Sequence, residues 1–186
     1  MIKMRLETER LIIRELEPGD ETIFAQMATD GSLAEIGFDR DCKSWIADWL
    51  TEARALTAQD NPTQDYLAYA LVEKDGQTVV GSVGCSYYED LQKVGITYFV
   101  GTAYRGLGYA AEAAKAYGAY FSKRYPLPSL IATVRKENPA SWKTVEKAGF
   151  QKTGERMYQD INDEQPELYY FYEWQESLAT EIPLAE

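Results

Sequence analysis

The segment that most constrains the fold reads Tyr104-Arg105-Gly106-Leu107-Gly108-Tyr109-Ala110-Ala111-Glu112. It lies between a β-branched, apolar run at 96–100, which predicts a strand, and a run of helical periodicity at 109–123. Glycines at 106 and 108 let the backbone bend sharply and come close to a ligand. The first turn of the following helix adds unpaired N–H groups and the positive end of its dipole. The segment therefore predicts a binding site for a phosphate or pyrophosphate, although an ordinary strand-to-helix turn would have the same pattern.

Two common phosphate-binding motifs fit this segment poorly. Gly106-x-Gly108-x-x-Ala111 matches the dinucleotide fingerprint, but that motif follows the first strand of a parallel βαβ unit and has an acidic residue about 20 positions later. Here several strands come first, and the corresponding region reads Tyr-Pro-Leu-Pro-Ser at 125–129. No Lys-Ser/Thr pair follows the glycines, so a Walker loop is excluded. A nucleotide-dependent oxidoreductase on a Rossmann sheet stays a remote alternative.

The regions on either side of this segment predict a single α/β (α+β) domain over residues 1–174, with a C-terminal tail at 175–186. Gly81 and Gly84 interrupt a strand and indicate bulges or a close backbone approach, and Asp75-Gly76 marks a tight hairpin turn. Trp45 and Trp49 fall on the apolar face of a helix, where they pack on the core or wall a substrate cleft. We expect a twisted mixed sheet of about seven strands flanked by about four helices. The expected strands are 10–16, 66–73, 79–88, 96–100, 130–134, 151–159 and 168–174, and the helices are 20–27, 41–57, 109–123 and 138–147.

The composition excludes several kinds of catalysis. The chain of 186 residues contains no histidine, so it has no Ser-His-Asp or Cys-His nucleophile pair. Cys42 and Cys85 alone cannot complete a zinc site, and we expect no metal. Acid–base chemistry must therefore use carboxylates, tyrosine, lysine, cysteine, serine, backbone groups or water. Hydrophobic residues make up 45% and charged residues 26%, as in ordinary folded domains.

Charge and cysteine content bear on partners and compartment. We expect both cysteines to be reduced and the protein to be cytoplasmic, with no apolar run near the ~20 residues of a membrane span and no apolar signal segment. A net charge of −11 argues against nucleic acid as the main partner. Residues 105–156 nevertheless carry a net charge of +6 and the remainder −17. This pattern suits an anionic ligand in one half and a cation elsewhere, or it reflects charges scattered over solvated helix faces.

Four motifs together resemble one known family. Arg105-x-x-Gly108-x-Ala110 is similar to the Q/R-x-x-G-x-G/A acyl-coenzyme-A loop of the GNAT N-acetyltransferases. The opening strand Glu7-Thr-Glu-Arg-Leu-Ile-Ile-Arg14, and Tyr98 followed by Gly-Tyr-Ala-Ala-Glu-Ala at 108–113, resemble the RimJ/RimL-like branch of ribosomal-protein alanine acetyltransferases. Asn138-x-x-Ser141-x-x-x-x-Glu-Lys-x-Gly-Phe150 resembles its second cofactor motif. The resemblance extends over about residues 6–174, with all four motifs in the family's order.

The resemblance implies a cofactor site for acetyl-CoA. The family's central strands splay apart to admit the pantetheine, and its amides pair with the strand edge at Phe99 and Val100 as an added strand would. Asn138 would contact the pantetheine arm. The backbone that would cradle the pyrophosphate belongs to Arg105, Gly106, Leu107, Gly108, Tyr109 and Ala110.

The implied reaction is direct attack of a primary amine on the acetyl thioester, and two family positions are changed here. Many GNAT enzymes protonate the departing thiolate with a tyrosine that is Val145 in this chain, and the resemblance suggests the Ser141 hydroxyl in its place. Ser141 is equally a residue that satisfies backbone groups at a helix start. Many also carry a glutamate as base where this chain has Gly95. Glu112, in the first turn of the cofactor helix, is interpreted as structural.

The base and the acceptor therefore stay open. Glu167 is one candidate base, Asp160 another, Glu89 and Asp90 are weaker ones, and ordered water is a further alternative. A backbone N–H near Phe99 is expected to stabilise the oxyanion. Acidic residues near the last hairpin and the first helices are expected to attract a cationic amine: Asp39, Asp41, Asp160, Asp163 and Glu164.

We therefore expect an acetyl-CoA-dependent N-acetyltransferase that acts on the amine of a small molecule or peptide. We expect it to be a monomer or homodimer, with no nucleic-acid or membrane partner. A non-catalytic acyl-CoA-binding regulatory domain is the alternative, because Val145 and Gly95 both replace possible catalytic groups.

Overall fold

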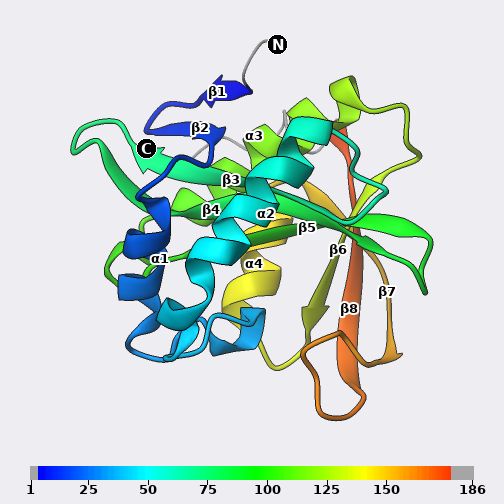
Figure 1. Cartoon of the computed structure of the whole chain (residues 1–186). Coiled ribbons are helices and arrows are strands. Elements are labelled where there is room, and N and C mark those ends of the chain that lie inside the picture. The colour runs from blue at the N-terminus through cyan, green and yellow to red at the C-terminus, as the bar shows by residue number, and fades with distance from the viewer. Residues whose placement is uncertain (1–3, 177–186) are drawn as a thin grey trace.

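The computed structural model describes residues 4–176, and these form one mixed sheet with helices on both faces (Figure 1). The strand order is β1-β2-β3-β4-β5-β6-β8-β7, and every neighbouring pair is antiparallel except β5 and β6. The strands are β1 (Arg5–Glu7), β2 (Leu11–Glu15), β3 (Tyr66–Glu73), β4 (Thr78–Tyr88), β5 (Lys93–Val100), β6 (Leu130–Arg135), β7 (Phe150–Tyr158) and β8 (Glu167–Trp174). The predicted fold class is confirmed. The eighth strand is β1, whose three residues are too few for a periodic signal and which forms by pairing with β2.

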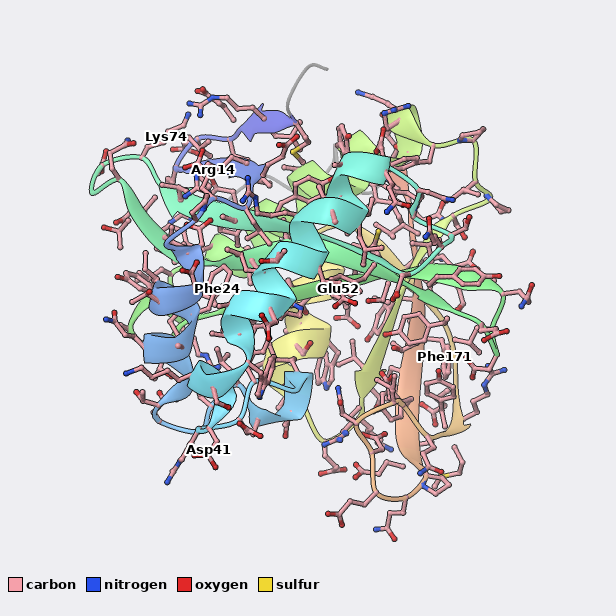
Figure 2. All side chains as sticks on the ribbon, viewed as in Figure 1. Arg14, Phe24, Asp41, Glu52, Lys74 and Phe171 are labelled. Atoms are coloured by element: carbon pink, nitrogen blue, oxygen red, sulfur yellow. The ribbon has the colours of Figure 1, made fainter. Side chains whose placement is uncertain are left out.

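Two apolar cores lie on opposite faces of the sheet. Helices α1 (Asp20–Ala28) and α2 (Ile46–Gln59) cover one face, and α3 (Tyr109–Arg124) and α4 (Pro139–Lys147) cover the other (Figure 1). Phe24 of α1 is fully buried in the first core, between α1 and the sheet (Figure 2). Short 3-10 turns occur at η1 (Ala34–Ile36), η2 (Cys42–Ser44) and η3 (Thr102–Tyr104). The helix predicted to start at residue 41 begins at Ile46, because η2 forms the turn before it.

The parallel strands β5 and β6 separate soon after they meet. Their ladder holds only two pairs, Val94 with Leu130 and Gly95 with Ile131. Beyond this point β6 pairs on its other side with β8, and the edge of β5 from Ile96 to Val100 that faces β6 has no ladder partner within residues 4–176. The expected splay of the central strands is therefore confirmed, and β5 and β6 diverge in the middle of the sheet (Figure 1).

Two glycines of β4 let its backbone approach the neighbouring strands closely. A Cβ atom at Gly81 would lie 2.0 Å from the carbonyl oxygen of Phe99, and one at Gly84 would lie 1.9 Å from that of Leu67. The ladder of β3 and β4 also shifts register between Leu71 and Val72, as the predicted bulge requires. In the following hairpin, residues 74–77 form the turn, with Gln77 rather than Gly76 at a positive φ of 50°.

The predicted limits of the domain, residues 1–174 followed by a tail at 175–186, stay a prediction. The backbone N–H of Gln175 donates to the carbonyl of Gly149 over 3.1 Å, so the chain stays attached to the domain just past β8. Residues 177–186 of the predicted tail lie outside the described residues. Over residues 4–176, no helix has the length and apolar character that a membrane crossing requires.

Candidate active site

The glycine segment adopts the conformation that its composition predicts. Gly106 and Gly108 lie in the left-handed region, with φ of 76° and 83°. Gly108 precedes the first residue of α3, and no side chain caps this helix end. The first N–H groups of α3 are therefore available to an anion, with the helix dipole adding to their positive potential.

Two arginines hold this segment in place. Arg105 donates from Nε to the carbonyl of Val100 over 3.1 Å and from Nη2 to that of Ser32 over 3.3 Å. Arg10 donates from Nη1 to the carbonyl of Leu107 over 2.8 Å. The Tyr109 side chain is buried and its hydroxyl donates to Glu73, so Tyr109 presents only its backbone to a ligand.

Glu112 anchors the start of α3 to the loop before β2. Its Oε1 accepts from the Thr8 hydroxyl (2.6 Å) and the Arg10 N–H (2.8 Å), and its Oε2 accepts from Arg10 Nε (2.8 Å). Burial raises the pKa of this carboxyl, but the hydrogen bonds from Thr8 and Arg10 outweigh burial and leave the pKa lowered. The side chain is structural, as expected, and it links the cofactor segment to the N-terminal strand.

Most of the positive charge of residues 105–156 lies elsewhere than at this helix end. Arg124 pairs with Asp60, and Arg135 pairs with Asp163. An anion at this helix end would therefore depend on backbone N–H groups more than on the net charge that the sequence shows.

A cavity of about 840 Å³ opens where β5 and β6 splay. Tyr98, Ser141 and Val145 line it on the α3/α4 side. Phe38, Trp49 and Phe99 line it on the α1/α2 side. Because side chains alternate along a strand, Gly95, Thr97 and Phe99 share the α1/α2 face of β5. The cavity is thus reached from both faces of the sheet, as a cofactor arm and an acceptor entering from opposite sides would require.

Asn138 and Ser141 occupy the first turn of α4, facing β5. Asn138 Oδ1 caps the helix by accepting from the Ser141 N–H over 3.1 Å. The Ser141 hydroxyl lies 2.8 Å from the Tyr98 hydroxyl, which also donates to the Ser141 carbonyl over 3.2 Å. Burial raises the pKa of Tyr98 to about 12, against a smaller opposite effect of the bond to Ser141, so Tyr98 keeps its proton at neutral pH. Ser141 is therefore both a helix-start residue and a hydroxyl facing the cavity, backed by a second hydroxyl.

On the α1/α2 face, a tyrosine takes the place of a side chain at position 95. A Cβ atom on Gly95 would lie 2.5 Å from Cε2 of the Tyr88 ring. Tyr88 reaches from β4 across Gly95 toward Thr133 of β6 and Asp160 of the β7–β8 loop, and all three side chains line the cavity. Burial raises the pKa of Tyr88 to about 12, and the charge of Asp160 adds to this.

The two remaining candidate bases of the last hairpin differ in position. Asp160 lines the cavity, whereas Glu167 is not among its lining residues and its carboxylate lies 3.6 Å from Arg135 Nε. Asp163 is engaged by Arg135 and by the Tyr169 hydroxyl, over 2.7 Å for the latter. Burial raises the pKa of Asp163, but these bonds outweigh burial and lower it. Arg135 thus fixes the loop that carries Asp160, which no local sequence pattern indicated.

The cavity as a whole has an acidic and aromatic lining. Five carboxylates and no Lys or Arg belong to its lining, which also includes eight aromatic rings. Of the acids expected to attract an amine, Asp160 lines it. Asp41 is exposed, does not line the cavity and lies near the start of α2 (Figure 2), and Asp39 accepts from the Asp41 N–H over 2.9 Å. The lining carboxylates are Glu35, Asp65, Glu89, Asp90 and Asp160, and the rings are Phe38, Trp49, Tyr66, Tyr87, Tyr88, Tyr98, Phe99 and Tyr158. Trp49 thus walls the cavity, and Trp45 instead packs on Phe38.

Comparison with known proteins shows which family the chain belongs to. The sequence profile of the acetyltransferase (GNAT) domain matches residues 10–151. The chain belongs to the GNAT acetyltransferase family. Among curated proteins, the uncharacterised N-acetyltransferase YnaD of Bacillus subtilis is 24% identical over 156 residues, which cover 81% of this chain and 85% of YnaD.

Solved GNAT structures share the whole fold. A GNAT-family acetyltransferase from Bacillus anthracis superposes with a TM-score of 0.76 at 21% identity, covering 94% of this chain and 99% of the other. RimJ from Mycobacterium smegmatis, in complex with CoA-disulfide, superposes with a TM-score of 0.72 at 18% identity, covering 98% and 90%. At these identities, the likeness shows a shared fold.

GNAT membership identifies the chain as an acetyl-CoA-dependent acetyltransferase. Acetyl-CoA suits the residues present, because an uncapped helix end, an unpaired strand edge and an open splay lie in succession. The Rossmann alternative is wrong, because the glycine segment follows the antiparallel strands β3 to β5. Among residues 4–176, no three Cys, Asp or Glu side chains gather where they could hold a metal ion.

Proposed function

We propose that this protein transfers the acetyl group of acetyl-CoA to the primary amine of a cationic acceptor, by direct attack of the amine. The observation that carries the proposal is one continuous cavity through the splayed sheet. It has hydroxyl donors on the cofactor side and carboxylates on the acceptor side.

The cofactor side binds and orients. The backbone of residues 105–110 holds the pyrophosphate, and the free edge of β5 at Phe99 and Val100 pairs with the pantetheine amides. Asn138, at the start of α4, contacts the pantetheine arm. When bound, acetyl-CoA supplies the activated acetyl thioester. A backbone N–H near Phe99 hydrogen-bonds the acetyl oxygen and stabilises the negative charge that develops on it.

Ser141 handles the proton on the same side. Its Oγ donates a proton to the departing sulfur, and the Tyr98 hydroxyl, 2.8 Å away, restores the proton to Ser141. Because the pKa of Tyr98 is raised to about 12, this hydroxyl is protonated and available as a donor throughout the neutral range.

The acceptor side selects for positive charge. Five lining carboxylates without a lining Lys or Arg give this end of the cavity a negative potential. Aromatic faces such as that of Trp49 also attract cations and pack on apolar groups. The acceptor class is therefore a small molecule or peptide whose amine is accompanied by further positive charge or an apolar group, and acidic peptides are disfavoured.

Ligand binding and turnover test the proposal separately. Thermal-shift measurements with acetyl-CoA, coenzyme A and NAD should show stabilisation by the first two alone. Release of free thiol is then followed with a polyamine, an arylalkylamine, a neutral peptide with a free N-terminus and an acidic peptide. We expect the polyamine or arylalkylamine to have the highest kcat/KM and the acidic peptide the lowest. Stabilisation by acetyl-CoA with no turnover on any amine would instead support a non-catalytic regulatory domain.

A further inference from the structure

The proposed transfer needs a group that takes the proton from the attacking amine. Many GNAT enzymes have a glutamate for this at the position that is Gly95 in this chain. Gly95 has no side chain, and the ring of Tyr88 fills the space beside it. A proton acceptor must therefore reach the α1/α2 side of the cavity from another element. The lining of that cavity limits the choice among the acids near the last hairpin.

We propose that Asp160 is the catalytic proton acceptor, and that Tyr88, lying across Gly95, completes the acceptor side of the site beside it. The assignment depends on the proposed acetylation of an amine. It places the proton acceptor on the α1/α2 face of the sheet and the proton donor Ser141 on the α3/α4 face. The amine and the leaving sulfur are then served from opposite sides of the splay.

The backbone around Asp160 is held firmly enough to aim a carboxylate. Its Oδ1 accepts from the Ile161 N–H over 2.7 Å, and its own N–H donates to Asp163 Oδ2 over 3.0 Å. Asp163 is in turn fixed by Arg135 and by the Tyr169 hydroxyl. Asp163 and Arg135 therefore act as positioning residues, and the Tyr88 side chain also hydrogen-bonds the Asp160 carboxylate from β4.

Charged and titratable groups surround Asp160 from every neighbouring element. Burial raises the pKa of Asp160, the Ile161 N–H opposes it, and the negative charges of Asp163 and Asp90 raise it further against Arg135. A carboxylate with a raised pKa is a stronger base than an ordinary aspartate. The groups that face Asp160 are Tyr88 of β4, Asp90 of the β4–β5 turn, Arg135 of β6, Tyr158 of β7, Asp163 of its own loop and Tyr169 of β8.

The rival acids are less suited to this role. Glu167 lies outside the cavity lining and beside Arg135. Glu89 and Asp90 line the cavity, but both are exposed at the β4–β5 turn, and Tyr158 donates to Asp90 over 3.4 Å.

The proton balance closes with the groups named. The ammonium group of the acceptor first loses one proton to water. The resulting neutral amine nitrogen bonds to the acetyl carbon while the bond from that carbon to the sulfur of coenzyme A breaks. The proton of the nitrogen passes to Asp160, and the sulfur takes the proton of Ser141 Oγ. Tyr98 reprotonates Ser141 and recovers its own proton from water, and Asp160 releases its proton to water, so no further reagent is consumed.

The test compares Asp160→Asn with wild type, using the amine with the highest kcat/KM in the panel. We expect kcat at pH 7 to fall by about 100-fold or more, with the acid limb of the kcat–pH profile lost. Calorimetry should show unchanged affinity for acetyl-CoA, and ¹³C NMR of labelled aspartate should show one carboxyl titrating above its ordinary range in wild type and missing in the variant. Glu155→Gln, an exposed acid of β7, is the matched control and should keep both rate and profile.

Two further variants separate a chemical role from a structural one. Added formate should restore part of the rate of Asp160→Ala, because a free carboxylate can fill the vacated space. Asp90→Asn should move the acid limb to lower pH, because it removes one of the charges that raise the pKa of Asp160. If Asp160→Asn keeps its rate and its acid limb while the wild type is active, this assignment is overturned. If the wild type turns over no amine at all, the proposed function fails instead.

Discussion

Gly95→Ala tests whether a bare backbone at position 95 is what allows Tyr88 to lie across β5. The new Cβ atom would lie 2.5 Å from Cε2, 3.1 Å from Cδ2 and 3.4 Å from Cζ of Tyr88. Carbon atoms in contact prefer about 3.5–4.0 Å, so the ring must recede by roughly 1 Å. Overpacking of this kind costs about 1–3 kcal/mol, and in a domain of this size about 2–4 °C of Tm for each kcal/mol.

The same displacement should reduce catalysis. A shift of about 1 Å in a positioned group can lower the rate as much as 100-fold, so we expect kcat of Gly95→Ala to fall at least tenfold. Affinity for acetyl-CoA should change little, because the anion site at α3 lies on the other side of the splay from Tyr88.

The assay is urea denaturation of the single variants and of the Gly95→Ala/Tyr88→Ala double variant. Without the Tyr88 ring there is nothing for the new methyl to meet, so the penalty of Gly95→Ala should disappear and the coupling energy should be about 1–3 kcal/mol. Gly154→Ala is the control, since a Cβ atom there has no neighbour within 4 Å. A Gly95→Ala protein as stable as wild type, or an equal loss in the Tyr88→Ala background, would refute the reasoning.

Three other changes probe separate parts of the site. Ser141→Ala should lower kcat at least tenfold while calorimetry shows nearly unchanged acetyl-CoA affinity, and unchanged turnover would remove Ser141 as the proton donor. Glu112→Gln should lower the free energy of unfolding at pH 7 by about 1–3 kcal/mol. The pKa of Glu112 is lowered from 4.5 in the folded state, so the stability that its carboxylate contributes is present above about pH 4.5 and is lost as the pH falls below that. The free energies of unfolding of wild type and Glu112→Gln should therefore converge in acid. A difference that stays constant with pH would contradict the structural role of the Glu112 carboxylate. Raising the salt concentration from 50 to 500 mM should raise KM for a cationic acceptor several-fold, and a salt-independent KM would argue against attraction by the cavity carboxylates.

Features that depend on a few neighbouring residues could be predicted from the sequence. Gly106 and Gly108 need positive φ for the turn into α3, and Asn138-Pro139 shows the start of α4 by its cap and first-position proline. Gly81 indicated a close approach without indicating to what. The splay of β5 from β6 was expected only through the family resemblance, since the strand lengths alone do not set where a ladder ends.

Contacts between distant segments could not be predicted in this way. Glu112 was expected to favour the helix dipole, but its partners Thr8 and Arg10 are about a hundred residues away in the chain. The Tyr98–Ser141 pair joins β5 to α4 across 43 positions. The sequence gives no sign of the role of Tyr88, because aromatic residues are common at the ends of strands. Its position becomes important because it lies over Gly95, which pairs with both β4 and β6 at the point where β5 and β6 begin to separate.

Hydroxyl groups lie on one face of the sheet and carboxylates on the other, and each face contains one position, Val145 or Gly95, that differs from the pattern of many GNAT enzymes. On the α3/α4 face, Val145 stands where many GNAT enzymes have a proton-donating tyrosine. The Ser141 and Tyr98 hydroxyls lie on the same face and are in contact with each other. On the α1/α2 face, Gly95 stands where many GNAT enzymes have a glutamate that accepts a proton. Tyr88 and Asp160 lie on that same face. Because strand alternation keeps the faces separate, a loss on one face can be offset only by a residue that reaches the same face. The two substitutions are therefore independent, and variants of Ser141 and Asp160 should combine additively in transition-state free energy up to the point where uncatalysed solvent proton transfer takes over.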